Sequence, residues 1–152
     1  MADGVFNVAL GKIAYYGGLP ATNDALIAVL IKTSGLQADA TLRDHDTLSA
    51  LLAASNDEAD ATNYVRKTLS GVTVTVDDTN ERVDIDCDDL TYTSLGGASN
   101  NTLSKIVICY DPDTTGGTDA DLIPLTHHDI TLTTDGTTVT VTIPSGGFAR
   151  AA

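Results

Sequence analysis

Hydrophobic and polar residues alternate strictly in two stretches of this chain, and the first of them covers residues 72–87. It reads V-T-V-T-V-D-D-T-N-E-R-V-D-I-D-C, so every second position is apolar on both sides of a polar centre. A period of two places successive side chains on opposite faces of a β-strand. A two-residue turn at Thr79-Asn80 then brings the apolar residues together on one face. The predicted cross-strand pairs are Val76 with Val83, Val74 with Ile85, and Val72 with Cys87.

The second alternating stretch, residues 130–143, reads I-T-L-T-T-D-G-T-T-V-T-V-T-I. An Asp-Gly pair between alternating segments is a strong signal for a tight hairpin turn. A turn at Asp135-Gly136 places all the apolar groups on one face and the threonines on the other. The predicted pairs are Thr134 with Thr137, Leu132 with Val139, and Ile130 with Val141. We therefore predict two antiparallel hairpins, each with one apolar and one polar face.

Two shorter segments are apolar at nearly every position, which is typical of central strands. They are residues 25–32 (A-L-I-A-V-L-I-K) and residues 106–110 (I-V-I-C-Y). For the first of them, periodicity alone leaves a buried helix as an alternative. Further short strands are expected at residues 64–69, 90–95 and 122–125. Several short strands between turn signals predict a mainly β fold, an antiparallel β-sandwich or barrel with one or two short helices in the N-terminal third.

The N-terminal third contains the candidate helices. Residues 47–54 read as a short helix, with Asp46 as its N-cap. Residues 5–16 form either a short helix that ends at two glycines or an arm that becomes ordered only against a neighbouring molecule. The length of 152 residues suits one domain. We expect an N-terminal arm or short helix at residues 1–20, a single β-rich domain at 21–146, and a C-terminal tail at 147–152.

The net charge of −13 limits the partners that the chain can bind. Binding to phosphate groups needs clustered Lys and Arg, and the eight basic residues are scattered, so nucleic acid and anionic membranes are poor partners. No apolar run approaches the roughly 18 residues that cross a bilayer. No basic and apolar leader opens the sequence, so we expect a protein that is made in a cytoplasm and stays soluble there.

The two cysteines, Cys87 and Cys109, both lie in predicted strands. One interpretation is a pair of reduced, buried, small hydrophobic side chains. The other is a cross-strand disulfide, which requires the two Cα atoms to approach within about 6 Å.

The loop at residues 111–121, D-P-D-T-T-G-G-T-D-A-D, carries weak candidates for a calcium site in Asp111, Asp113 and Asp119. Carboxylate oxygens are the ligands that calcium prefers, and the first positions follow the spacing of an EF-hand loop. The twelfth position should be a glutamate but is Leu122, and the flanks read as strands. A solvated connection is the simpler interpretation, because Asp and Gly favour turns for backbone reasons. We expect no metal and no cofactor.

Histidines beside carboxylates are the other candidate chemistry. His127 and His128 are adjacent, so a strand would point them to opposite faces, and Asp129 follows them. A His–Asp pair can act as a general base. However, the chain has no Ser or Cys in a nucleophile-elbow motif and no glycine-rich phosphate loop. We therefore predict that the protein is not an enzyme.

Apolar residues near both ends of the chain are candidates for contact with a partner. Terminal segments often become ordered on binding. For the N-terminal aromatic residues, packing in the core is the alternative. The candidate interface residues are Val5, Phe6, Leu10, Tyr15, Tyr16, Phe148 and Arg150.

The order of these elements resembles that of small β-rich structural proteins of tailed bacteriophages. The matching pieces are A-L-I-A-V-L-I-K, V-R-K-T-L-S-G-V-T-V-T, D-D-L-T-Y-T-S-L, I-V-I-C-Y-D-P-D-T-T-G-G-T-D-A-D-L-I-P-L and D-I-T-L-T-T-D-G-T-T-V-T-V-T-I-P. They span about residues 10–150. A longer loop around residues 35–60 and the absence of tryptophan depart from the pattern.

The resemblance implies a virion component that assembles in the host cytoplasm. Its expected role is that of a capsid decoration, or cement, protein that binds the major capsid protein and further copies of itself. A tail or neck protein of the virion is an alternative. A calcium- or sugar-binding β module is a third interpretation, although few aromatic side chains are available to stack on sugar rings.

Overall fold

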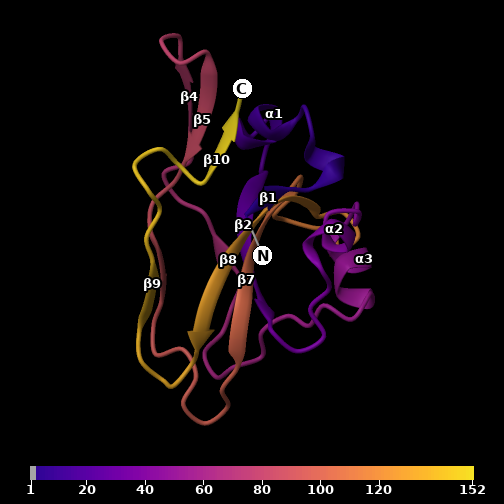
Figure 1. Ribbon diagram of the computed structural model, residues 1–152, viewed down its shortest axis with the longest axis vertical. Coiled ribbons are helices and arrows are strands. Elements are labelled where there is room, and N and C mark those ends of the chain that lie inside the picture. The colour runs from indigo at the N-terminus through magenta and orange to yellow at the C-terminus, as the bar shows by residue number, and fades with distance from the viewer. Residues whose placement is uncertain (1–2) are drawn as a thin grey trace.

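The computed structural model describes residues 3–152 as a mainly β fold built around one five-stranded sheet (Figure 1). The strand order is β1-β8-β7-β2-β3, and each neighbouring pair is antiparallel. The strands are β1 (Gly4–Val5), β2 (Ala25–Lys32), β3 (Lys67–Thr68), β7 (Thr102–Asp111) and β8 (Ile123–Thr133). The predicted fold class is confirmed. Of its two forms the barrel is wrong, because the described strands leave this sheet open at β1 and β3.

Two smaller sheets and four short helical segments complete the described part of the chain. A three-stranded sheet has the order β10-β5-β4, and a two-stranded sheet pairs β6 with β9. Their strands are β4 (Thr73–Asp77), β5 (Arg82–Asp86), β6 (Leu90–Tyr92), β9 (Val139–Val141) and β10 (Ala149–Ala151). The helical segments are the 3₁₀ turn η1 (Asn7–Ala9) and the helices α1 (Ile13–Gly17), α2 (Asp39–Leu42) and α3 (Leu48–Ala53).

The five-stranded sheet is buried on both faces, which explains the unbroken apolar runs at residues 25–31 of β2 and 106–110 of β7. In β2, Leu26, Ala28 and Leu30 belong to one hydrophobic cluster, whereas Ile27, Val29 and Ile31 belong to the other. The second cluster includes Leu42, Leu48 and Leu51 of α2 and α3, and the first includes Ile85, Leu90 and Tyr92 of the smaller sheets. Figure 1 shows α2 and α3 on one side of the sheet and β9 on the other.

The first predicted hairpin is confirmed with its register. β4 and β5 pair antiparallel, with Val76 opposite Val83 and Val74 opposite Ile85. The connection at residues 78–81 is centred on Thr79 and Asn80 but is longer than the predicted two-residue turn, and the predicted pair of Val72 with Cys87 lies outside the ladder, which starts at Thr73. This hairpin projects beyond the body of the molecule (Figure 1).

The second predicted hairpin is wrong. Leu132 lies opposite Leu103 of β7, and Thr140 lies opposite Thr91 of β6. β7 is ten residues long and offers β8 a partner along its whole length. After β8 the chain crosses to the two-stranded sheet through Asp135-Gly136, where the Gly136 amide donates to Leu95 O at 2.8 Å. Alternation fixes which face a side chain takes, but not which strand lies beside it.

Within residues 3–152, the segments near both ends of the chain are part of the folded body. η1 and α1 replace the single helix or free arm that was expected at residues 5–16. In the segment expected to be a tail, β10 pairs with β5. The N-cap of α3 is Thr47 rather than Asp46, because the Thr47 side chain accepts a hydrogen bond from the Ala50 amide at 3.1 Å.

The cysteines do not form a disulfide. Cys87 and Cys109 are free and buried in different hydrophobic clusters, on opposite faces of the five-stranded sheet. The sheet between them excludes the Cα approach that a disulfide requires.

Candidate functional site

Figure 1 shows that α1, β4, β5 and β10 together form one end of the molecule, and the segments there contain four of the exposed large hydrophobic residues. Leu10 and Tyr15, from the N-terminal segment, are 62% and 63% exposed. Val74 and Val76, from β4, are 37% and 66% exposed. We call these four residues the apolar end. Among the described residues, the remaining large hydrophobic side chain with comparable exposure is Val65, which precedes β3 on the far edge of the five-stranded sheet.

The C-terminal strand connects the two halves of the apolar end. One shallow hollow has Leu10 and Ala151 in its lining, and a second has Val76 and Ala151. The cross-strand pairs put Val74, Val76 and Ile85 on the same face of the hairpin. α1 covers only the inner part of that face, where a Cβ on Gly17 would lie 3.0 Å from Ile85. The outer part of the face is therefore uncovered.

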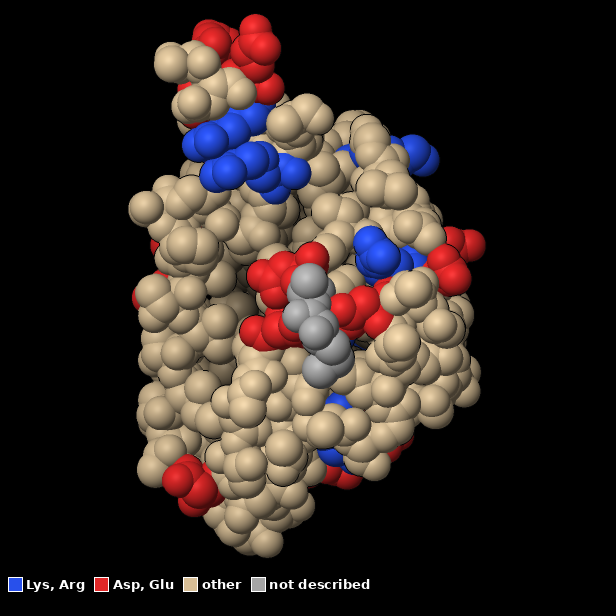
Figure 2. Space-filling model, viewed as in Figure 1, with Lys and Arg blue, Asp and Glu red and all other residues tan. Residues whose placement is uncertain are grey.

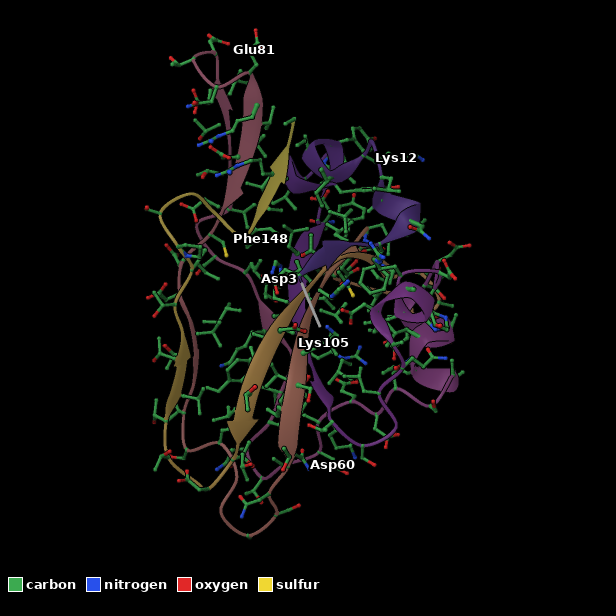
Figure 3. The ribbon with its side chains drawn as sticks, viewed as in Figure 1. Asp3, Lys12, Asp60, Glu81, Lys105 and Phe148 are labelled. Carbon is green, nitrogen blue, oxygen red and sulfur yellow. The ribbon has the colours of Figure 1, made fainter. Side chains whose placement is uncertain are left out.

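The opposite face of the three-stranded sheet is polar. Arg150 Nε donates to Asp84 Oδ1 at 2.8 Å, and Arg82 Nε donates to Asp84 Oδ2 at 3.0 Å. The hydrogen bond from Arg150 lowers the pKa of Asp84 below its usual value. In Figure 2, basic atoms form a band just below the acidic tip of the hairpin, where Figure 3 places Glu81. The hairpin therefore has one ion-paired face and one apolar face.

β4 is an edge strand, because β5 lies on one side of it and no described strand lies on the other. Its outer backbone N–H and C=O groups are available to a further strand. The strand reads T-V-T-V-D, so Asp77 is its single charged residue. Proteins usually protect exposed edges with lysine, proline or bulges, none of which β4 contains.

The structure divides the predicted interface residues into two groups. Leu10 and Tyr15 lie on the apolar end, and Arg150 is exposed but paired with Asp84. The other four pack inward. The assignment of Phe6 is corrected, because this side chain is 0% exposed and its ring packs nearly perpendicular to that of His127, with the ring centres 5.7 Å apart.

Val5, Tyr16 and Phe148 are partly buried against the first hydrophobic cluster. The ring of Tyr16 lies 4.8 Å from that of Tyr110, and the ring of Phe148 lies 6.4 Å from that of His128. Their main contacts are therefore within the chain.

A buried polar cluster lies on the helix-covered face of the five-stranded sheet. Lys105 of β7 is 0% exposed, and its Nζ forms ion pairs with Asp129 of β8 and, at 2.9 Å, with Asp39 Oδ1 of α2. The Asp129 amide donates to Asp3 Oδ1 at 2.8 Å, which connects the N-terminal residues to this cluster. Figure 3 shows Asp3 and Lys105 close together near the middle of the molecule.

His127 and His128 occupy opposite faces of β8, as their adjacency predicts. His127 is 1% exposed, and its Nδ1 lies 3.4 Å from Lys105 Nζ. Burial, followed by the positive charge of Lys105, lowers the pKa of His127. His128 instead contacts Thr126 through Nε2 at 3.0 Å and Asp3 through Nδ1 at 3.3 Å.

The lowered pKa of His127 predicts that stability falls as the pH decreases. Below the ordinary value of 6.5, the unfolded chain binds a proton at this ring that the folded chain does not bind. The free energy of unfolding should therefore fall between pH 6.5 and the lower folded-state pKa, by up to about 1.4 kcal/mol per pH unit. Urea unfolding at pH 7.5 and pH 5 checks this. His127→Gln should flatten the dependence and His45→Gln should not, whereas equal slopes in all three proteins would contradict the assignment.

A cavity of about 350 Å³ lies on the other face of the sheet, between it and the segment that leads from β9 to β10. Its lining is mainly apolar, with Asp3, His128 and Asp129 among its polar residues. Cys87 is the potential nucleophile in this lining, but burial and the charge of Asp86 raise the pKa of its thiol to about 11. The thiol is therefore protonated at neutral pH, and a Cys–His nucleophile does not form here.

The structure brings two of the three candidate calcium ligands together, because Asp111 and Asp113 line one hollow and the Asp113 amide donates to Asp111 Oδ1 at 3.0 Å, whereas Asp119 is paired elsewhere. Asp119 accepts hydrogen bonds from Arg66 at 2.6 Å and 2.9 Å, and Arg66 also contacts Glu58. Asp113 instead accepts hydrogen bonds from Thr115 within its own turn. Within residues 3–152, no group of three His, Cys, Asp or Glu side chains is arranged to hold a metal ion. In the same part of the chain, no helix has the length and apolar character to cross a membrane.

Sequence reasoning missed the Lys105 cluster. The available signal was a lysine directly before the apolar run I-V-I-C-Y, because a charge inside a central strand must be paired. The sequence does not indicate its partners, since Asp39 and Asp129 are 66 residues before it and 24 residues after it.

Comparisons of this chain with protein-family models, with curated proteins and with solved structures find no match.

Proposed function

We propose that this chain is a structural component of a tailed-phage virion, a capsid decoration protein whose apolar end docks on the major capsid lattice. The observation that carries this proposal is the apolar end itself, the exposed side chains of Leu10, Tyr15, Val74 and Val76 at the end of the molecule that carries an open edge strand. Contiguous exposed apolar surface on a soluble protein marks a site of interaction. An extended segment of the partner can also add to the edge of β4 through main-chain hydrogen bonds.

The apolar end is small, so it is better suited to a weak contact repeated at many equivalent positions than to one strong contact. Full burial of one large apolar side chain contributes about 1.5–3 kcal/mol, and association costs part of that gain. Four such side chains therefore support a modest affinity at each position. A symmetric shell presents the same site many times, and contacts between neighbouring docked copies increase the overall strength of attachment.

The charge distribution supports docking by this end. The net charge of −13 keeps free copies apart and soluble before assembly. At the apolar end, β4 carries a single charge, and Arg82 and Arg150 partly neutralise the carboxylates behind it. Away from the acidic tip at residues 78–81, the desolvation cost of docking by this end is therefore low.

We predict that Val76→Asp reduces incorporation into particles without unfolding the protein. Val76 is 66% exposed, so its replacement should change the free energy of unfolding by less than about 0.5 kcal/mol. A carboxylate buried without a partner in the interface should reduce binding by at least about tenfold. The measurement is the amount of each variant that co-sediments with particles lacking the wild-type protein.

Val65→Asp is the matched control, because Val65 is 59% exposed but lies outside the apolar end. The proposal expects Val65→Asp to bind as the wild-type protein does. Equal binding of the Val76 variant would show that docking uses another surface.

A further inference from the structure

The most unusual group in the described part of the chain is a completely buried lysine between two carboxylates from different layers of the fold. Lys105 is 0% exposed, and its Nζ contacts Asp39 of α2 and Asp129 of β8. We propose that Lys105 and Asp39 join in an intramolecular isopeptide bond, with Asp129 as the proton-transfer group. This inference is independent of the proposed virion function.

The geometry supplies the proximity that amide formation needs. Lys105 Nζ lies 2.9 Å from Asp39 Oδ1, so the amine and the carboxyl group are already in contact. Holding reactants in this way corresponds to an effective concentration of about 10⁵ M or more when the alignment is good. The Oδ1 atom of Asp39 is shielded from solvent, which restricts the access of water that would favour the reverse reaction.

Asp129 is placed to move the protons. It lies directly opposite Lys105 in the register of β7 and β8, and its carboxylate accepts a hydrogen bond from Lys105 Nζ. Its side chain is 30% exposed, against 21% for Asp39, so it can also exchange protons with solvent. These differences assign Asp39 as the electrophile and Asp129 as the acid and base.

The reaction balances without any further reagent. One proton moves from the Lys105 ammonium to the Asp39 carboxylate, which leaves a neutral amine and a neutral carboxyl group. The Nζ lone pair attacks Cγ of Asp39 to form a tetrahedral intermediate. Asp129 accepts a proton from nitrogen and donates it to the departing hydroxyl, which leaves as water while the C–O bond breaks. The products are one amide, one water molecule and the Asp129 carboxylate.

The bond would connect the helical layer to the centre of the sheet. Asp39 is the first residue of α2, and Lys105 lies within the central strand β7. The link would close a loop between these two residues and would restrict the unfolded chain as a disulfide does. The two free cysteines supply no such cross-link.

Mass spectrometry of the intact, denatured protein tests the proposal. The bonded chain should be lighter than its sequence by one water molecule, and a full mass in the folded, aged protein would overturn the proposal. Asp39→Ala and Lys105→Gln should both restore the full mass expected for their sequences. The wild-type measurement does not depend on whether these variants fold.

A tryptic map distinguishes the bond from other losses of water. Acylated Lys105 resists trypsin, so residues 33–43, which contain Asp39, should remain attached to residues 83–150. A bond to Asp129 would lie wholly within 83–150, and so would dehydration at Asp135-Gly136. Loss of water with residues 33–43 released as a free peptide would therefore overturn the assignment.

The role of Asp129 has its own test. Asp129→Asn keeps a side-chain oxygen that accepts a hydrogen bond but removes the base, so the rate of water loss, followed from the time the chain is synthesised, should fall about a hundredfold. Asp44→Asn is the matched control, because Asp44 is exposed and its side chain contacts Asn7. Equal rates in the wild-type protein and the Asp129 variant would overturn the proton-transfer role.

Discussion

Replacing Lys105 with methionine is expected to lower the free energy of unfolding by about 3–5 kcal/mol, because it leaves two carboxylates facing each other without their counter-ion. Lys105 is 0% exposed and pairs with both Asp39 and Asp129. The cost comes less from the lost attraction than from the uncompensated charges that remain. Urea unfolding at pH 7.5 measures the change.

Two further variants test whether the loss of stability comes from the buried charges around Lys105. Lys12→Met removes the same charge from an exposed position and should change stability by less than about 0.5 kcal/mol. Combining Lys105→Met with Asp39→Asn and Asp129→Asn should recover much of the loss, because no charge then remains unpaired. If Lys105→Met and Lys12→Met are equally stable, the buried cluster does not stabilise the fold. The proposed isopeptide bond replaces the ion pair between Lys105 and Asp39, so in the bonded protein the loss also includes about 4 kcal/mol for the opened loop, which the triple variant does not recover.

Phe6→Ala is expected to lower the free energy of unfolding by about 3–5 kcal/mol, which is the usual cost of removing a buried aromatic ring. Phe6 belongs to the cluster that contains Leu42 and Leu48, and its ring packs against His127. The variant leaves a cavity between the N-terminal segment and the helical layer. Thermal and urea unfolding both measure this loss.

Tyr15→Ala is the control for the same segment, because Tyr15 is 63% exposed and should cost less than about 0.5 kcal/mol. The two variants separate a residue that holds the segment in place from one that presents it to a partner. A stable Phe6→Ala protein would mean that the N-terminal segment detaches in solution, and the core assignment of Phe6 would then be wrong.

The sequence predicted where the strands lie more reliably than which strands are neighbours in a sheet. The hairpin of β4 and β5 follows from local alternation, since its partners are joined by a short turn. The equally regular stretch at residues 130–143 is divided between β7 and β6. The choice of partner there depends on long-range contacts with residues 90–103, and no local pattern encodes them.

For the candidate site, the sequence indicated which residues are apolar but not which of them are exposed. Leu10 and Tyr15 were recognised as apolar residues near the N-terminus, but periodicity could not separate them from Phe6 in a segment of mixed 3₁₀ and α structure. Val74 and Val76 were expected on an apolar face, yet the sequence did not reveal that α1 leaves the outer part of that face open. The Lys105 cluster depends on residues from α2 and β8, so the fold is needed to bring it together.

The number of copies per particle tests the central claim most directly. To test the proposed function, the protein is quantified against the major capsid protein in purified, intact virions and located by imaging of the same particles. The account predicts a copy number on the scale of the capsid subunits, with density that follows the symmetry of the head. A handful of copies confined to the neck or tail would contradict the decoration role, and absence from purified virions would contradict a structural role in the particle altogether.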